Sequence, residues 1–308
     1  MFKDWKSILD AATEAESFFE DFDEVQITVP EGQVFCRIKG FGPPLVLLHG
    51  YPQTSAMWHR VAPRLSEEYT VICPDLRGYG RSSKPANAAN HESYSKRATA
   101  GDILAALDFL GHERFLIGAH DRGARVAHRL AADHPGRVRA LAILDIAPTR
   151  EMYAKATSAF AADYWHWYWL IRPAPIPETM IGHDPKGFWV NKLYASPVFN
   201  APFYRQALSE YLDAFDDPDV IRASCEDYRA AYSIDIEHDD AEAGPINMPL
   251  LANWGANGAI ERHFDCLALW RERASNVTGH SMPGGHFLAE EVPEDVLAAW
   301  LPFFANAP

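Results

Sequence analysis

Short apolar runs, each followed by a loop, recur along the chain and predict the strands of a buried sheet. They cover residues 45–48, 71–73, 115–117, 140–144 and 250–253. Continuous apolar runs of this length suit parallel strands that are covered on both faces. Helical stretches such as 99–110 and 124–133 lie between them, and this alternation is typical of an α/β fold with a mostly parallel sheet.

Two earlier runs alternate apolar and polar residues instead. Residues 25–29 and 34–38 flank the sequence Pro-Glu-Gly-Gln, and together they predict a β-hairpin.

The strand pattern stops near residue 148 and resumes near residue 248. Residues 149–240 are rich in Trp, Tyr and Ala, carry a proline cluster at 172–177, and contain no convincing parallel strand. We therefore expect an α/β core made of residues 1–148 and 241–308, with residues 149–240 inserted as a helical cap. Such a cap can exclude water from a site at the carboxyl ends of the strands. Extra helices without a gating role are the alternative.

The composition narrows the class of partner. The chain has 308 residues, 48% of them hydrophobic and 23% charged, and a formal net charge of −14. A nucleic-acid binder usually shows a basic face, so we expect no nucleic-acid partner. An acidic protein also repels anionic substrates at long range, and local cations must overcome that field if the substrate is an anion.

Cysteine spacing and hydropathy suggest a cytoplasmic protein without a metal site. The four cysteines, Cys36, Cys73, Cys225 and Cys266, form no CxxC pair, which argues against a zinc or redox motif. No stretch approaches the roughly 18 apolar residues of a membrane span, so we expect no membrane partner. Residues 1–25 lack the pattern of a signal peptide, and we expect their aromatic side chains to dock this acidic opening segment on the protein.

One strand-to-helix junction has the form of a nucleophile elbow. The apolar run 115–119 ends in His120-Asp121-Arg122-Gly123, where a helix begins. The turn needs small flanking residues because backbone segments approach closely, although Ala119 stands where Gly is commoner. A carboxylate at the middle position displaces a leaving group from alkyl carbon and forms an alkyl ester. Asp121 is therefore the candidate nucleophile, and a helix N-cap is its plainer alternative role.

Hydrolysis of that ester calls for a general base and an acid that orients it. His286 follows the last predicted strand, which suits the chain order of a catalytic triad, and the Gly-Gly step before it favours His286 over the nearby His280. Asp145 ends the run 140–144 and is the expected orienting acid. Glu261, in the loop after residues 250–255, is the alternative.

A second turn points toward the same site. His49-Gly-Tyr51-Pro follows the run 45–48 and can direct the backbone N–H of Tyr51 at the elbow. With the backbone N–H of Arg122 it would form an oxyanion hole for attack on the ester. We expect His49 itself to be structural.

The sequence resembles a known family at these residues. The segments His49-Gly-Tyr-Pro-Gln-Thr, Gly80-Arg-Ser, Gly118-Ala-His-Asp-Arg-Gly-Ala-Arg125 and Gly285-His-Phe-Leu are similar to the epoxide hydrolase and dehalogenase branch of the α/β-hydrolases. The fluoroacetate (haloacetate) dehalogenases are the nearest group, and the similarity runs from about residue 25 onward. It includes the cap segments His166-Trp167 and Cys225-Glu-Asp-Tyr228-Arg.

The resemblance implies an α/β-hydrolase fold, a small haloacid substrate, no cofactor and a homodimer. It implies that Arg122 and Arg125 hold the substrate carboxylate, and that His166, Trp167 and Tyr228 hold the departing halide. The residues support this assignment, because Arg122 and Arg125 stand at i and i+3 on one helix and two guanidinium groups suit a carboxylate. Pairing with a nearby acid is the alternative for either arginine.

The sequence also departs from the family pattern. Tyr51 stands where the family often has Phe, and residues 194–197 match poorly, which suggests a changed entrance or substrate size.

We expect a hydrolase that converts short 2-haloacids to 2-hydroxy acids. An epoxide hydrolase with the same triad is the main alternative; it would need two acidic Tyr side chains, from Tyr228 and one of Tyr153, Tyr164 or Tyr168. A haloalkane dehalogenase is disfavoured because Trp usually follows its nucleophile, where this chain has Arg122. A non-catalytic binding protein with the same fold is the remaining alternative.

Overall fold

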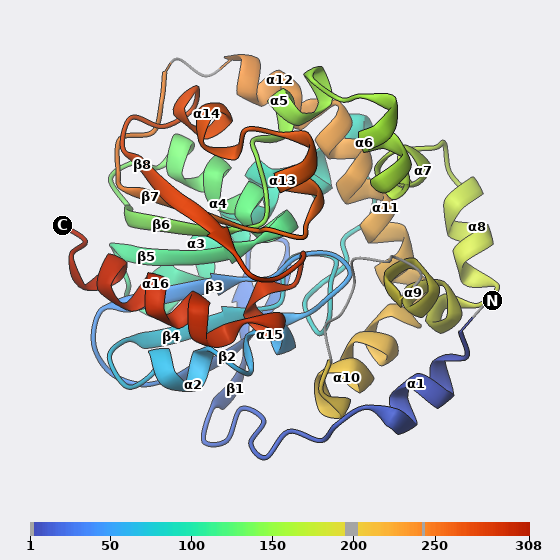
Figure 1. Cartoon of the computed structure of the whole chain (residues 1–308), viewed down its shortest axis with the longest axis horizontal. Coiled ribbons are helices and arrows are strands. Elements are labelled where there is room, and N and C mark those ends of the chain that lie inside the picture. The colour runs from blue at the N-terminus through green and yellow to red at the C-terminus, as the bar shows by residue number, and fades with distance from the viewer. Residues whose placement is uncertain (1–2, 195–202, 242–243) are drawn as a thin grey trace.

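The computed structural model describes residues 3–194, 203–241 and 244–308. Its described residues form one eight-stranded sheet in the order β1-β2-β4-β3-β5-β6-β7-β8 (Figure 1). The strands are β1 (Asp23–Val29), β2 (Gly32–Lys39), β3 (Pro44–Leu48), β4 (Thr70–Pro74), β5 (Phe115–His120), β6 (Val138–Leu144), β7 (Leu250–Gly255) and β8 (Val277–Met282). The predicted hairpin and the five predicted inner strands are confirmed.

Strand direction follows the expected pattern. β1 pairs with β2 and β2 with β4 in antiparallel register, whereas the pairs from β3 to β8 are all parallel. Every residue of β5 is buried, as its continuous apolar run requires. The carboxyl ends of β3, β5, β6 and β7 therefore meet along one edge of the sheet.

Strand β8 was not predicted, and its sequence explains the omission. It forms the edge of the sheet, and Met282 is the only one of its six residues that is buried. Only one side of an edge strand pairs with a neighbour, so its side chains are less covered and need not be apolar. The sequence of β8, Val277-Thr-Gly-His-Ser-Met282, therefore lacks the apolar run by which the inner strands can be recognised.

Helices cover both faces of this sheet. Figure 1 shows α16 (Pro293–Ala305) in front of the sheet, and α3 (Lys96–Phe109) and α4 (Asp121–Asp133) behind it. The remaining helices of this part are α2 (Ala62–Leu65), α13 (Ala259–His263), α14 (Cys266–Arg271), α15 (Leu288–Glu291) and the 3-10 turns η1 (Ser55–Trp58) and η2 (Ala89–Tyr94).

Between β6 and β7 the described residues contain helices and turns but no sheet strand. The helices are α5 (Thr149–Ala154), α6 (Ser158–Asp163), α7 (Trp165–Leu170), α8 (Ile176–Gly182), α9 (Pro185–Tyr194), α10 (Arg205–Phe215), α11 (Pro218–Tyr232) and α12 (Ile234–Ala241). Helices α7 to α11 lie to the right of the sheet in Figure 1, and we refer to α5–α12 as the cap helices. Most of the 194–197 segment, where a changed entrance is expected, lies outside the described residues.

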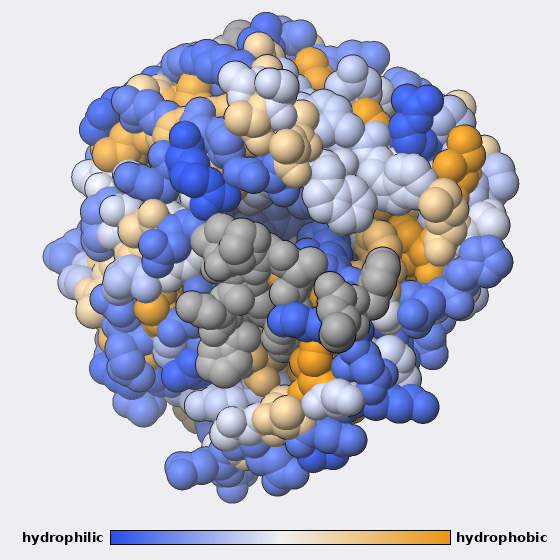
Figure 2. Space-filling model, turned by 45° about the vertical axis from the view of Figure 1, so that its right-hand side comes forward, coloured by the Kyte–Doolittle hydropathy of each residue, from blue (hydrophilic) through white to orange (hydrophobic). Residues whose placement is uncertain are grey.

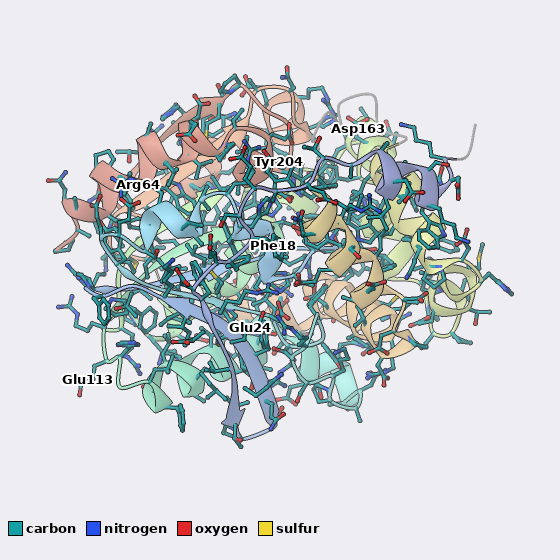
Figure 3. All side chains as sticks on the ribbon, turned by 90° about the horizontal axis from the view of Figure 1, so that it is seen from below. Phe18, Glu24, Arg64, Glu113, Asp163 and Tyr204 are labelled. Atoms are coloured by element: carbon teal, nitrogen blue, oxygen red, sulfur yellow. The ribbon has the colours of Figure 1, made fainter. Side chains whose placement is uncertain are left out.

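The opening helix α1 (Trp5–Ala11) packs against the cap helices α9 and α10. The Lys186 ammonium lies 5.0 Å from the centroid of the Trp5 ring. Farther along, Phe18 and Tyr204, which are labelled in Figure 3, approach the ring of His59, with centroid separations of 5.4 and 5.3 Å. The N-terminal segment therefore contacts both the cap helices and His59, the residue that follows η1.

The face of the molecule drawn in Figure 2 is mainly polar. Hydrophilic residues cover most of the face seen in Figure 2, and hydrophobic residues appear there in small groups. Among the helices of the described residues, none combines the length and the apolar content of a membrane-spanning segment.

Candidate active site

The turn between β5 and α4 places Asp121 at the sheet edge. Asp121 adopts a positive φ of 44° and is 4% exposed. A Cβ atom at Gly123 would lie 2.3 Å from the carbonyl oxygen of His49 and 2.4 Å from that of Leu48, so only glycine allows this approach. Asp121 itself is a non-glycine residue with a positive φ, and backbone strain of this kind is typical of a functional turn.

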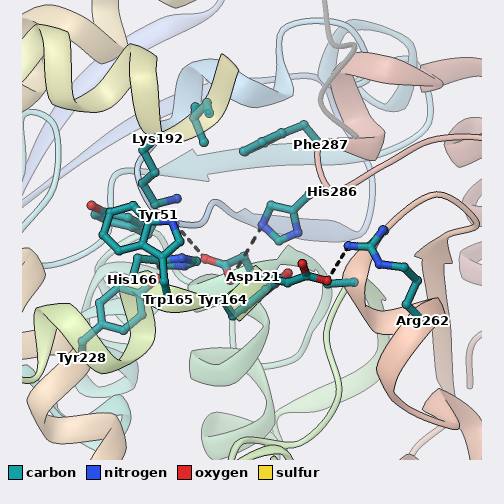
Figure 4. Close-up of a pocket in the computed structure, with 14 residues that line it drawn as sticks. Tyr51, Asp121, Tyr164, Trp165, His166, Lys192, Tyr228, Arg262, His286 and Phe287 are labelled. Carbon is teal, nitrogen blue, oxygen red and sulfur yellow. Dashed lines mark hydrogen bonds and ion pairs between the residues drawn. The ribbon is translucent and has the colours of Figure 1, made fainter. Parts of the chain in front are cut away.

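The loop after β3 contacts the same carboxylate. The backbone N–H of Tyr51 donates a hydrogen bond to Asp121 Oδ1 at 3.0 Å (Figure 4). A Cβ atom at Gly50 would lie 2.5 Å from the Cβ of Asp121, so glycine is required here too. His49 Nε2 accepts a hydrogen bond from Leu76 N at 2.9 Å, which fits its expected structural role.

His286 lies between two carboxylates. Its Nδ1 is 2.6 Å from Asp145 Oδ2, and its Nε2 is 3.9 Å from Asp121 Oδ2. The second oxygen of Asp145 accepts a hydrogen bond from Gly255 N at 2.9 Å, which holds the acid in place. Of the two acids considered for orienting the histidine, the structure brings Asp145 to it, whereas Glu261 accepts a hydrogen bond from the indole of Trp254.

These contacts determine the protonation states of His286 and Asp121. Burial alone would lower the pKa of His286, but its hydrogen bond with Asp145 and the negative charges of Asp145 and Asp121 outweigh burial and raise that pKa. Burial opposes ionisation of Asp121, but the positive charges of His286, Arg125 and Arg122 lower its pKa. Asp121 is therefore an ionised carboxylate at neutral pH, as a nucleophile must be.

A cavity of about 430 Å³ opens above Asp121 and His286 (Figure 4). Its wall contains aromatic rings and charged groups from the cap helices as well as the elbow. The lining residues are Tyr51, Asp121, Asp163, Tyr164, Trp165, His166, Lys192, Leu193, Tyr228, Gly258, Ala259, Arg262, His286 and Phe287. A cavity of this size suits a small organic ligand.

Arg122 and Arg125 lie beside this cavity rather than on its wall. Arg122 donates through Nε to Asp227 Oδ2 and through Nη2 to Asp227 O, each at 2.7 Å. Arg125 donates through Nη1 to the Thr149 hydroxyl at 2.8 Å. Pairing with an acid, the alternative considered for either arginine, is thus observed for Arg122. Even so, the buried Arg122 Nη1 and Arg125 Nε have no hydrogen-bond partner among the described residues.

Of the three residues expected to bind halide, two line the cavity and one lies behind its wall. His166 and Tyr228 line the cavity, with their ring centroids 5.8 Å apart. Trp167 is fully buried behind the wall, 4.8 Å from the Arg125 guanidinium, and Trp165 from the same helix lines the cavity instead. The indole N–H of Trp167 also lacks a partner among the described residues.

Lys192 and the pair Asp163 and Arg262 were missed in the sequence. Arg262 donates to Asp163 Oδ2 at 3.0 Å on the cavity wall. Lys192 lies on α9 between the buried Val190 and Leu193. A charged residue inside an apolar stretch is the one signal that could have identified it. In the described part of the chain, no group of three or more His, Cys, Asp or Glu side chains is arranged to hold a metal ion.

Comparisons with known proteins agree with this architecture. A family model described as alpha/beta hydrolase fold matches residues 43–291. A fluoroacetate dehalogenase from Burkholderia sp is 43% identical over 291 residues, which span 94% of this chain and 96% of that protein. A soluble epoxide hydrolase from Corynebacterium sp. (strain C12) is 32% identical over 289 residues, spanning 86% and 91% of the two chains.

A solved structure supports the same assignment. A protein from Nostoc sp PCC 7120, provisionally described as an α/β hydrolase, shares 47% sequence identity and superposes with a TM-score of 0.90 over 94% of this chain and 100% of that one. The predicted fold class and family resemblance are confirmed, and the chain belongs to the α/β-hydrolase family, in the group that includes the fluoroacetate dehalogenase and the soluble epoxide hydrolase.

Proposed function

We propose that this protein is a hydrolytic dehalogenase that converts short 2-haloacids, including fluoroacetate, to 2-hydroxy acids and halide. One observation carries the proposal. Buried N–H groups of Arg122, Arg125 and Trp167 around the nucleophile lack an acceptor among the described residues. Buried donors are nearly always paired, so such donors beside an ionised carboxylate favour a substrate that brings its own anionic acceptors.

In the first step, Asp121 attacks the α-carbon of the haloacid. A bond forms between an Asp121 oxygen and that carbon, the carbon–halogen bond breaks, and its electron pair leaves with the halide. Arg122 and Arg125, which lie beside the cavity, direct their unpaired N–H groups to the substrate carboxylate. The His166 ring and the Tyr228 hydroxyl on the wall, with the N–H of Trp167 behind it, receive the halide. Burial and the charge of Lys192 hold the pKa of His166 well below its usual range, so its neutral ring has one N–H to donate.

In the second step, water cleaves the ester on Asp121. His286 accepts a proton from water, and the resulting hydroxide attacks the carboxyl carbon of Asp121. The N–H groups of Tyr51 and Arg122 stabilise the negative charge that develops on the carboxyl oxygen. The bond between the carboxyl carbon and the alkyl oxygen then breaks, and the leaving alkoxide takes up the proton of the added hydroxyl group, so that the hydroxy acid leaves and Asp121 returns to a carboxylate. Asp145 stabilises the positively charged His286 until its proton passes to solvent.

Halide release tests the proposal directly. We expect the wild-type protein to release fluoride from fluoroacetate and chloride from chloroacetate, with glycolate as the organic product. A folded protein that releases neither ion would overturn the proposal, and chloride without fluoride would restrict it to chloroacids.

Replacement of the base tests the ester intermediate. His286→Asn should release at most one halide per protein and gain the mass of a carboxymethyl group on Asp121, because the ester can no longer be hydrolysed. An unchanged protein mass after exposure to substrate would contradict the mechanism. Asp121→Asn, which cannot form the ester, is the matched control.

An epoxide hydrolase is the second candidate, because two tyrosines of the cap helices line the cavity. Tyr164 and Tyr228 both reach its wall, and burial raises the pKa of each hydroxyl well above its usual range. Protonated phenols suit donation to an epoxide oxygen. Diol formation from a simple epoxide, faster than halide release from chloroacetate, would favour this candidate.

We also propose that the protein assembles as a homodimer. Ile176 and Met180 on helix α8 are 47% and 59% exposed, and exposed apolar side chains of this size suit a protein contact. Light scattering should give twice the mass of one chain, and a monomer at working concentration would contradict the proposal.

A further inference from the structure

We propose that Lys192 is a third cation of this site and binds the substrate carboxylate from the side of the cap helices. This inference rests on the proposed function, because it requires an anionic substrate in the cavity above Asp121. It names a substrate-binding residue that lies on neither the elbow helix nor the catalytic loops.

The position of Lys192 supports the proposal. Lys192 belongs to α9, and its side chain lines the cavity together with Asp121, His166 and His286. Figure 4 shows the side chain descending from its helix toward Tyr51, on the side of the cavity opposite Arg262. The ammonium lies 5.0 Å from the centroid of the Tyr51 ring, and the backbone of the same Tyr51 contacts the nucleophile.

The bonding of Lys192 distinguishes it from the other cations near the nucleophile. Arg262 is engaged by Asp163, and Arg122 by Asp227. Among the described residues, no side chain or carbonyl accepts a hydrogen bond from the Lys192 ammonium, whose closest recorded partner is the face of the Tyr51 ring. An ammonium has three donors, and one aromatic face leaves them without an oxygen acceptor from the described residues, open to the cavity.

The protonation of Lys192 reflects this incomplete environment. Burial lowers its pKa to about 8, and the negative charge of Asp121 opposes the shift only in part. A carboxylate bound beside the ammonium would supply the missing negative charge and raise that pKa. By linkage, the carboxylate must then bind more tightly to the protonated lysine than to the neutral one.

Other groups that face Lys192 must be separated from its effect. Asp121 and Tyr51 lie below it, His166 and Tyr228 come from α7 and α11, and His286 comes from the loop before α15. Of these, His286 has a raised pKa and also gains charge as the pH falls. A variant that lacks the lysine but keeps His286 therefore isolates the contribution of Lys192.

Binding of acetate provides a test that does not need turnover. Acetate carries the carboxylate of the substrate without a leaving group, and calorimetry can measure its dissociation constant. We expect Lys192→Met to weaken acetate binding about 10- to 100-fold near pH 7, the usual range for a charge-assisted hydrogen bond. The matched control is Lys186→Met on the same helix; Lys186 pairs with Asp213 at 2.7 Å and should leave acetate binding unchanged.

The pH dependence gives a readout that a purely structural role would not produce. Acetate affinity of the wild-type protein should fall above pH 8, by up to about tenfold per pH unit as Lys192 loses its proton. Lys192→Arg should restore binding and remove this fall, because a guanidinium stays charged in that range. Lys192→Met should show only the smaller pH dependence that His286 contributes.

The outcomes separate this inference from the proposed function. If the wild-type protein releases no halide but binds acetate in a Lys192-dependent manner, the dehalogenase proposal fails and the role of Lys192 stands. If halide is released while Lys192→Met leaves both acetate binding and KM for chloroacetate unchanged, the role of Lys192 is overturned. Absence of acetate binding to the wild-type protein would overturn it equally.

Discussion

His286 must be neutral to accept a proton from water, so its pKa sets the lower pH limit of ester hydrolysis. The hydrogen bond and charge of Asp145 raise this pKa against the effect of burial. Activity should therefore rise with pH through a value above the roughly 6.5 of an unperturbed histidine. Measuring kcat for chloride release between pH 5 and 9 would give the pH at which activity rises.

Replacement of the orienting acid should alter both rate and pH profile. Asp145→Asn removes the hydrogen bond and the charge that do most to raise the pKa of His286 and leaves burial and the charge of Asp121. The rise in activity should therefore move to lower pH. The rate should fall about 10²- to 10⁴-fold, because the ring loses its orientation and the stabilisation of its charged form. Glu261→Gln, which removes the other acid considered in the sequence, should leave kcat and the pH of the rise in activity unchanged. A fall in kcat equal to that of Asp145→Asn would contradict the assignment of Asp145.

Sequence patterns singled out Asp121, His286 and Asp145 as candidates, which the structure brings together, because each follows a strand, where chain order restricts the choice. They did not locate Lys192 or Arg262. Lys192 reaches the cavity only because α9 folds over the sheet edge, and no spacing along the chain records that approach. The orientations of Arg122 and Trp167 were equally inaccessible, because they depend on Asp227 and on packing between helices distant in sequence.

Helix α11 is joined to the α/β part of the chain by a buried carboxylate. Asp227 receives hydrogen bonds from Arg122 Nε on α4 at 2.7 Å and from the Tyr79 hydroxyl at 2.9 Å, and it pairs with Lys96 on α3. Asp227→Asn would leave the buried Arg122 without its anion and Lys96 with only the more distant Asp235, at 3.5 Å. The free energy of unfolding should fall by about 3–5 kcal/mol, the cost of removing one partner from a buried ion pair.

The pH dependence of stability checks this assignment. Burial opposes ionisation of Asp227, but Arg122 and Lys96 hold its pKa well below the usual range. The stability it contributes is therefore present above the unfolded pKa of about 3.9 and is lost as the pH falls below that value. The difference between wild type and Asp227→Asn in urea unfolding should be large at pH 6 and smaller at pH 3. Equal midpoints at pH 6 would contradict this role, and Asp213→Asn on the surface of α10 is the control.

Element by element, the apolar runs predicted the inner strands well because burial on both faces leaves a strong pattern. The edge strand β8 lacked that pattern. Most of the helices between β6 and β7 are short, although α11 has 15 residues, and they are amphipathic to different degrees. Composition therefore indicated their class but not their boundaries. The packing of α1 on α9 and α10 is a contact between distant segments that periodicity does not encode.

For the whole molecule, a net charge of −14 must be reconciled with the proposed anionic substrate. The cations near the nucleophile are buried and act at short range, whereas most of the acidic groups are exposed and screened within about 8 Å at physiological salt. The acidic group that matters most is thus one on the cavity wall. Asp163 is such a group, and it is held by Arg262 at 3.0 Å and by His263 at 2.8 Å.

Neutralising Asp163 should therefore improve capture of the substrate. Asp163→Asn removes a negative charge from the wall and leaves Arg262 uncompensated, so KM for chloroacetate should fall by about two- to fivefold, a change of roughly 0.4–1 kcal/mol. Chemistry on Asp121 and His286 is untouched, so kcat should change little. Glu67→Gln makes the same change in net charge at an exposed residue that does not line the cavity, and KM should hardly respond. An equal fall in KM for both variants would mean that the overall charge, not the charge of the wall, governs entry.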